Sequence, residues 1–277
     1  MLSCTAVALF SVMSALAKGL GGTYATIQII LFRSAFALIP VAVAVHRIGL
    51  TSSLHVQRPG LIAVRAILGL LAMGTYFYSL TVLPLVEVIA LTFAAPLFTS
   101  VFGIVFLGEH VGWRRWTAIF IGFAGVLVML RPGSALFSPW SLLPLILAMF
   151  YSLSVITVRK LARTETSAAI VLYFSVICVT VAAVGTPFVW ITPTWTHLGL
   201  LIAMGVAGGT IQLCAAAALR RAEVALLAPF EYTSMLWTTI IGYLIWRELP
   251  EPHIWLGATT VGISAVYIAY RESKVAR

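Results

Sequence analysis

The chain has 277 residues, of which 61% are hydrophobic and only 9% are charged. A water-soluble domain carries about 25% charged residues, so this composition excludes a soluble protein and predicts an integral membrane protein. The net charge of +9 comes from basic residues scattered at the ends of apolar runs, which argues against a nucleic-acid-binding surface.

The acidic residues are eight glutamates, and aspartate is absent. This excludes a Ser-His-Asp triad and an aspartate-rich metal or phosphate site. Cys4, Cys178 and Cys214 all lie inside apolar runs without a CxxC spacing, and are expected to be buried thiols rather than disulfides or metal ligands. We expect no metal site and no cofactor. No nucleotide-binding motif is present, so ATP coupling within this chain is excluded.

Ten apolar segments follow one another, each close to the ~20 residues that a helix needs to cross a bilayer. Short separators with glycine, proline or charged residues divide them. We therefore predict an all-α integral membrane protein with ten transmembrane helices and no soluble domain. The segments are 2–19, 25–45, 60–80, 85–107, 116–131, 140–158, 167–190, 198–219, 223–246 and 254–270.

The first segment, Met1–Leu20, lacks the basic region that begins a cleaved signal peptide. Removing it would also leave the first half of the protein one helix short. We expect it to be retained as a span, with a short cytoplasmic tail preceding it.

The second half repeats the first at an offset of 139 residues. Arg58–Trp116 aligns without a gap on His197–Trp255, with eight identities in 59 positions. Basic residues occur at opposite helix ends in the two copies, and basic residues mark cytoplasmic ends. The copies are therefore predicted to be inverted, an arrangement common in secondary transporters. The identities are Gly60/Gly199, Leu61/Leu200, Gly69/Gly208, Leu80/Leu219, Thr99/Thr238, Gly103/Gly242, Glu109/Glu248 and Trp116/Trp255.

Counting lysine and arginine predicts the orientation. With the N-terminus inside, thirteen basic residues fall on the inner side and three, Lys18, Arg131 and Arg247, on the outer side. Arg33 is left within a span. Both termini are therefore predicted to be cytoplasmic. The inner set is Arg47, Arg58, Arg65, Arg114, Arg115, Arg159, Lys160, Arg163, Arg220, Arg221, Arg271, Lys274 and Arg277.

Two stretches carry a family resemblance. The first copy reads TYFYSLTVLPLVEVIALTFAAPLFTSVFGIVFLGEHVGWRRWTAIFIGFAGVLVMLRPG, and the second reads AALRRAEVALLAPFEYTSMLWTTIIGYLIWRELPEPHIWLG. Both contain a small-residue span, a span with an internal proline, and Gly-Glu or Arg-Glu before the last helix. The chain resembles the EamA family of the drug/metabolite transporter superfamily, with a first repeat at 1–133 (helices 1–5) and a second, inverted repeat at 140–272 (helices 6–10).

The resemblance implies a location in the bacterial inner membrane and a central cavity lined by helices 1–4 and 6–9, with helices 5 and 10 at the side. Similar sequences are assigned to export of amino acids and metabolites, or to uptake of S-adenosylmethionine or riboflavin. The first copy is most similar to the uptake-type members.

Glu231 and Arg33 are the charged residues expected deep in the membrane. Each lies about eight residues into its span, so ~12 Å from one edge of a ~30 Å core. A charge at that depth must be paired, solvated or neutralised. Glu231 either binds a cationic part of the substrate, carries a coupling proton, or is protonated and bonded to a backbone carbonyl. Arg33 either holds a carboxylate or phosphate of the substrate, or is the counter-ion of Glu231.

Pro96 and Pro229 are expected to interrupt the fourth and ninth spans, because proline lacks the amide proton that a helix needs. Broken helices in corresponding spans often mark a transporter's binding site, although a hinge or a simple kink remains open for each proline.

Polar and aromatic side chains on the expected cavity spans complete the predicted substrate site. An aromatic cage would suit a planar or cationic metabolite, whereas an aromatic in a span can equally serve packing. Gly205 and Gly209 form a GxxxG pair expected to bring helices together, and Glu109 and Glu248 are expected to anchor helix ends and loops. The further substrate-binding candidates are Tyr76, Phe93, Tyr151, Gln212 and Tyr232.

We therefore expect a secondary transporter of a small organic molecule, working by alternating access in the lipid bilayer. Protons are a candidate co-substrate, and a homodimer is compatible with the sequence. A non-transporting receptor or assembly subunit is the first alternative, but the chain offers almost no extramembrane surface for partners. An intramembrane enzyme is the second, and the clustered acids or histidines that such enzymes use are absent.

Overall fold

The computed structural model describes residues 2–48, 56–108, 112–132, 138–221 and 233–275, and the regular secondary structure in these ranges is all helical. Its elements in chain order are α1 (Leu2–Gly21), α2 (Thr26–Ile48), α4 (Pro59–Val82), α5 (Leu85–Thr92), α6 (Ala95–Leu107), α7 (Trp113–Leu130), the 3₁₀ turn η1 (Pro139–Leu142), α8 (Leu143–Leu161), α9 (Ser167–Gly185), the 3₁₀ turn η2 (Thr186–Val189), α10 (Trp195–Arg221), α12 (Thr233–Trp246) and α13 (Pro252–Val275).

The predicted all-α membrane fold is confirmed. Every predicted span contains a helix of the structure, and the fourth contains two, α5 and α6. Within the described ranges, six spans are long and apolar enough to cross a membrane, and two shorter apolar helices accompany them. Trp116–Leu130 and Ser234–Trp246 are the shorter two.

The fourth span breaks where Pro96 predicts. Phe93 and Ala94 donate their amides to carbonyls three residues back, and Pro96 then occupies the first turn of α6. A proline is tolerated there because the amides of a first turn have no partner within the helix. The hydroxyl of Ser152 on α8 lies 2.8 Å from the carbonyl oxygen of Ala95 and 2.7 Å from that of Ala148 in its own helix, so the break lies directly against α8.

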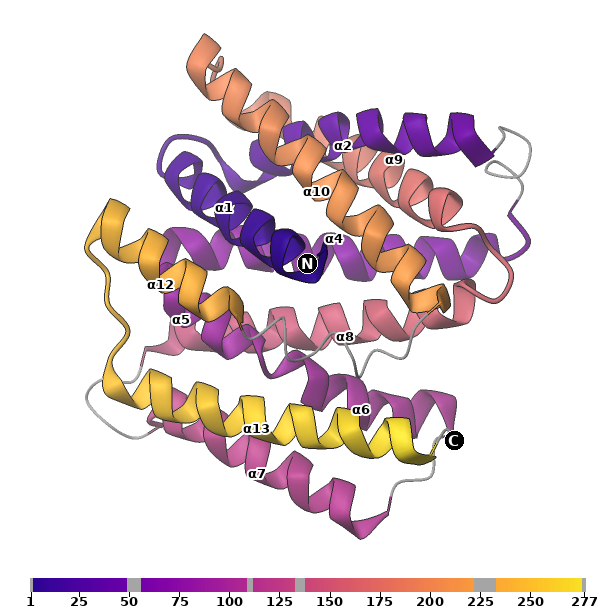
Figure 1. Ribbon diagram of the computed structural model, residues 1–277. Coiled ribbons are helices and arrows are strands. Elements are labelled where there is room, and N and C mark those ends of the chain that lie inside the picture. Colours follow the sequence, from indigo (N-terminus) through magenta and orange to yellow (C-terminus); the bar gives the residue numbers. More distant parts are fainter. Residues whose placement is uncertain (1, 49–55, 109–111, 133–137, 222–232, 276–277) are drawn as a thin grey trace.

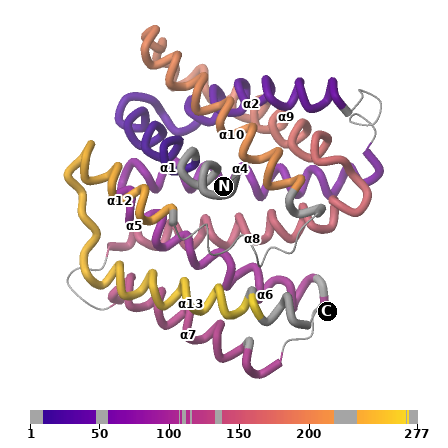
Figure 2. The backbone as a smooth tube through the Cα atoms, viewed as in Figure 1, coloured from indigo at the N-terminus to yellow at the C-terminus, as the bar shows by residue number. Residues whose placement is uncertain are grey.

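Figure 1 shows α7 and α13 packed side by side at one edge of the molecule, as expected for helices 5 and 10. The backbone trace in Figure 2 shows α2, α9 and α10 gathered at the opposite edge, with α4 and α8 between the two groups. Gly125 of α7 and Gly257 of α13 allow the contact at the first edge. A methyl group on Gly125 would stand 2.9 Å from the carbonyl oxygen of Gly257.

The predicted GxxxG pair brings α10 onto α2. A methyl group on Gly205 would lie 2.5 Å from Cβ of Phe36, and one on Gly209 would lie 2.7 Å from the carbonyl oxygen of Ala37. The two backbones therefore approach more closely than any larger side chain would permit, which confirms the small-residue contact.

The repeat is visible in the backbone geometry of helix ends. Gly108 after α6 has φ 67°, and Arg247 after α12 has φ 58°. These two residues are equivalent under the offset of 139, and a left-handed residue after the last turn is a common way to end a helix. Glu248, the residue after Arg247, is thereby turned back toward the bundle.

Candidate functional site

Arg33 lies inside the helix bundle, as its position in the second span predicts. Only 6% of the residue is exposed, and its Nε is buried without a hydrogen-bond partner in the described part of the chain. Its guanidinium lies against Gly208 near the middle of α10, where a methyl group would stand 2.9 Å from both Nε and Nη2. The repeat-related glycine therefore provides the space for a buried cation.

Arg65 departs from the prediction. The count of basic residues placed its charge on the inner side, although the residue lies within the predicted span 60–80. In the structure it is the seventh residue of α4, about 9 Å along the helix, and its charge lies inside the bundle. Its Cζ lies 4.3 Å from the ring centre of Phe174 on α9, and its Nε and Nη1 are buried without described partners. The apolar residues on both sides of Arg65 were the signal that could have indicated this position.

Gln212 and Tyr151, two further predicted substrate residues, differ in burial. Gln212 on α10 lies one turn after Gly208, and its Oε1 is buried without a partner among the described residues. Tyr151 on α8 is 48% exposed, so its substrate role stays a prediction. The structure therefore buries polar atoms of Arg33, Arg65 and Gln212.

Tyr76 lies in the packed core instead. It is 7% exposed, stacks on Phe10 with ring centres 6.0 Å apart, and its hydroxyl lies 2.5 Å from Oγ of Ser14. Because the Ser14 hydroxyl donates its one proton to the carbonyl of Phe10, Tyr76 must be the donor in this pair. The pair joins α4 to α1, and a substrate contact by Tyr76 stays a prediction.

The two partners of this bond are expected to differ when removed. Ser14→Ala leaves the buried Tyr76 hydroxyl without a partner and should lower the free energy of unfolding by about 2 kcal/mol. Tyr76→Phe removes the donor itself and should cost about 1 kcal/mol. Thermal unfolding of both variants in detergent measures which of them loses more unfolding free energy. Tyr78→Phe, at a residue 43% exposed, is the control, and a larger loss for Tyr76→Phe than for Ser14→Ala would contradict the expected cost of the orphaned Tyr76 hydroxyl.

Phe93 ends α5 at the helix break, where it packs against both large clusters of buried apolar side chains. Its partial burial is compatible with packing and with a cavity contact, so its substrate role stays a prediction. Pro229, Glu231 and Tyr232 fall outside the described residues. Their predicted roles, and the predicted pairing of Arg33 with Glu231, therefore remain expectations.

Glu248 anchors the end of the bundle that is predicted to face outside. Lys18 Nζ at the end of α1 lies 2.5 and 2.6 Å from its two carboxylate oxygens, and the amide of Leu85 donates to Oε2 over 3.1 Å. The Lys18 ammonium also lies 5.1 Å from the ring centre of Trp246. The loop-anchor prediction for Glu248 is confirmed, while its partner Lys18 was not identified from the sequence.

Two further contacts close the same end. The Tyr24 hydroxyl lies 2.8 Å from Nδ1 of His197 at the start of α10. The side-chain amide of Gln28 donates to the carbonyl of Ile191 over 2.6 Å and accepts from its amide over 3.1 Å. In this structure the first turn of α2 and the residues just before it therefore contact the start of α10 and the connection that precedes it.

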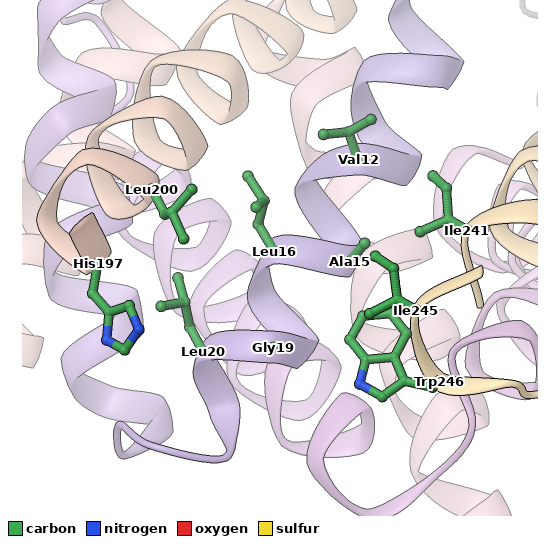
Figure 3. A pocket seen from close by; sticks show the side chains of 10 residues that line it. All are labelled: Val12, Ala15, Leu16, Gly19, Leu20, His197, Leu200, Ile241, Ile245 and Trp246. Carbon is green, nitrogen blue, oxygen red and sulfur yellow. The ribbon is translucent and has the colours of Figure 1, made fainter. Parts of the chain in front are cut away.

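An apolar groove of about 440 Å³ lies beside this end, between α1, α10 and α12. Figure 3 shows Leu200 and His197 on one side and Ile241, Ile245 and Trp246 on the other, with side chains of α1 between them. No predicted substrate residue lines the groove, and its walls are almost entirely hydrocarbon. It is thus distinct from the polar interior around Arg33.

Comparison with known proteins agrees with the architecture. The sequence model of a protein family described as "EamA-like transporter family" matches the chain twice, at residues 1–131 and 138–270. An S-adenosylmethionine uptake transporter of Rickettsia bellii is 26% identical over 94% of this chain and 89% of its own length. A riboflavin transporter of Vibrio cholerae is 28% identical over 99% of this chain and 93% of its own length.

A third similar protein is the pseudopaline exporter CntI of Pseudomonas aeruginosa, 26% identical over 94% of this chain and 92% of that protein. A solved crystal structure superposes with a TM-score of 0.68 at 17% identity, covering 98% of this chain and 97% of the other. At that identity the structural match establishes the fold alone.

Proposed function

Because the chain belongs to the EamA-like transporter family, we propose that it moves a small organic metabolite across the membrane by alternating access between its two halves. The family establishes a multi-pass membrane transporter rather than an enzyme. The observation that carries the proposal is the pair of matched units. We propose from the positions of the basic residues that the two units are inverted, which lets them open to either side in turn around a shared interior.

The substrate is proposed from the chemistry of the relatives. Two of them are named for uptake of S-adenosylmethionine and transport of riboflavin, and a third for export of pseudopaline. These are polar organic molecules of moderate size, so this chain is proposed to carry a metabolite of the same kind or an amino acid. The bacterial inner membrane, with both termini cytoplasmic, is its proposed setting.

The test is transport into sealed vesicles containing the purified protein. Radiolabelled S-adenosylmethionine, riboflavin and a mixture of amino acids are each offered with the same unlabelled compound inside, so that exchange can proceed without an energy source. Accumulation above protein-free vesicles is the expected result. Saturable binding without accumulation would favour the receptor alternative, and chemical conversion of the label would favour the enzyme.

Glu231 carries a separate prediction about energy coupling. If its carboxyl group carries the coupling proton, Glu231→Gln should abolish accumulation driven by an imposed pH gradient while exchange at equal pH persists. Uptake into vesicles with an acidic exterior measures gradient-driven accumulation, and uptake at equal pH measures exchange, each for the wild-type and the Glu231→Gln protein. Gradient-driven accumulation that Glu231→Gln leaves unchanged would eliminate proton transfer at this residue, and leave facilitated diffusion or another coupling group.

A further inference from the structure

Two arginines, Arg33 of α2 and Arg65 of α4, place guanidinium nitrogens in the buried interior of this protein. Arg33 reaches Gly208 near the middle of α10, and the Arg65 guanidinium lies over Gly69 near the middle of α4. A methyl group on Gly69 would stand 2.1 Å from Nη1 of Arg65. Gly69 and Gly208 are equivalent under the repeat offset, so the repeat supplies one glycine for each arginine.

The direction of the Arg65 side chain is unusual for a membrane helix. Arginines near helix ends ordinarily extend toward the nearer interface, where the charge is hydrated. Arg65 lies seven residues from the start of α4, yet its guanidinium lies over Gly69, four residues further along the helix. The charge is therefore held deeper in the bundle than the backbone position requires.

Helix α9 packs against both helices that carry these arginines, α2 and α4. The ring of Phe174 lies under Arg65, and the buried Cys178 lies one turn further along α9. Two like charges at this depth repel one another, and each is deprived of bulk water.

No described carboxylate offsets these charges. The four glutamates whose side chains the structure describes each have another partner. Glu87 accepts from Ser141, Glu165 from the amides of residues 57 and 58, Glu248 from Lys18, and Glu251 pairs with Arg131. A buried charge without a counter-charge is costly, and none of the described glutamates supplies one here, so these two arginines are suited to an anionic ligand.

Resting on the transport function proposed above, we propose that Arg33 and Arg65 form an oxyanion site that takes a carboxylate or phosphate group of the transported metabolite. Planar guanidinium groups bind both anions through paired hydrogen bonds. Gln212, whose Oε1 is buried one turn after Gly208, can contact the rest of the ligand. Under the offset Arg65 faces Met204, so this cation has no counterpart in the second repeat.

The direct test measures anion binding to the purified protein by the midpoint of thermal unfolding, Tm. Citrate and inorganic phosphate supply the two oxyanions, and choline chloride at matched ionic strength supplies a cationic control. A ligand that binds the folded state raises Tm by mass action. Citrate or phosphate should raise the Tm of the wild-type protein. The anion that gives the larger increase in Tm shows whether the site prefers a carboxylate or a phosphate group.

Arg33→Gln and Arg65→Gln should each weaken this response by about tenfold or more in apparent Kd, because each removes charge-assisted hydrogen bonds. Arg58→Gln is the matched control, since it removes an exposed charge from the residue before α4 and should leave the response intact. Arg33→Lys and Arg65→Lys retain the charge and guard against a failure to fold. They should keep part of the response.

Glu231→Gln separates this proposal from an internal ion pair. If the ligand's oxyanion is the partner of the arginines, Glu231→Gln keeps or strengthens the response to citrate and phosphate. Folded Arg33→Gln and Arg65→Gln proteins with unchanged affinity would overturn the proposal. So would a wild-type protein that exchanges riboflavin across vesicles yet ignores both anions, whereas absence of exchange for every substrate would count against the transport function instead.

Discussion

Replacing Gly205 by valine is expected to lower the free energy of unfolding by about 3 kcal/mol, because overfilling a close helix contact forces backbone shifts. The first added carbon would lie 2.5 Å from Cβ of Phe36 and 2.9 Å from the carbonyl oxygen of Arg33. Neither is the flexible end of a side chain, so α10 and α2 must separate. Thermal unfolding of the variant in detergent measures the loss.

Gly199→Val provides the control on the same helix. A methyl group on Gly199 would meet nothing within 4 Å, so valine there should change the free energy of unfolding by about 0.5 kcal/mol or less. An equal loss in the two variants would show that the cost arises from the helix backbone rather than from the contact with α2. The Gly205 variant should also disturb Arg33, whose carbonyl forms part of that contact.

Glu248→Gln is expected to lower the free energy of unfolding by about 2 kcal/mol, because it leaves the ammonium of Lys18 in place without its counter-charge. The side chains of Lys18 and Glu248 are 11% and 26% exposed, so solvent screens the pair only in part. The amide of Leu85 also loses a charged acceptor. Unfolding in detergent with Lys18→Met, Glu248→Gln and the double variant gives the coupling energy directly.

The double variant Lys18→Met with Glu248→Gln should recover part of the loss, since neither charge then remains buried. Arg131→Gln is the control for an ordinary surface pair, because Arg131 and Glu251 lie 3.7 Å apart with side chains 36% and 59% exposed. Its effect should be about 0.5 kcal/mol or less. If the Lys18 and Glu248 losses simply add in the double variant, the ion pair contributes nothing to closing this end of the bundle.

Several features were determined by the sequence alone because they depend on position along the chain. A run of apolar residues specifies a span whatever its neighbours are, and Pro96 interrupts a helix wherever that helix lies. The glycine spacing at Gly205 and Gly209 likewise indicates a close contact, although not with which helix. The repeat followed from residue identities and agrees with the two matched family units, while the inversion of the two copies stays a prediction. Counting along its span placed Arg33 inside the second helix, where the structure buries it.

Only the tertiary structure decided which side chains meet. In a soluble helix the polar face indicates solvent, but most faces of a membrane span are apolar, so the pattern does not separate cavity from lipid. The sequence therefore could not show that Tyr76 donates to Ser14 or that Lys18 pairs with Glu248. Arg65 was misplaced for a related reason. Counting along a helix gives the depth of the backbone, whereas a long side chain can place its charge a further turn away in either direction. Only the contacts of Arg65 with Gly69 and Phe174 show that its side chain extends inward.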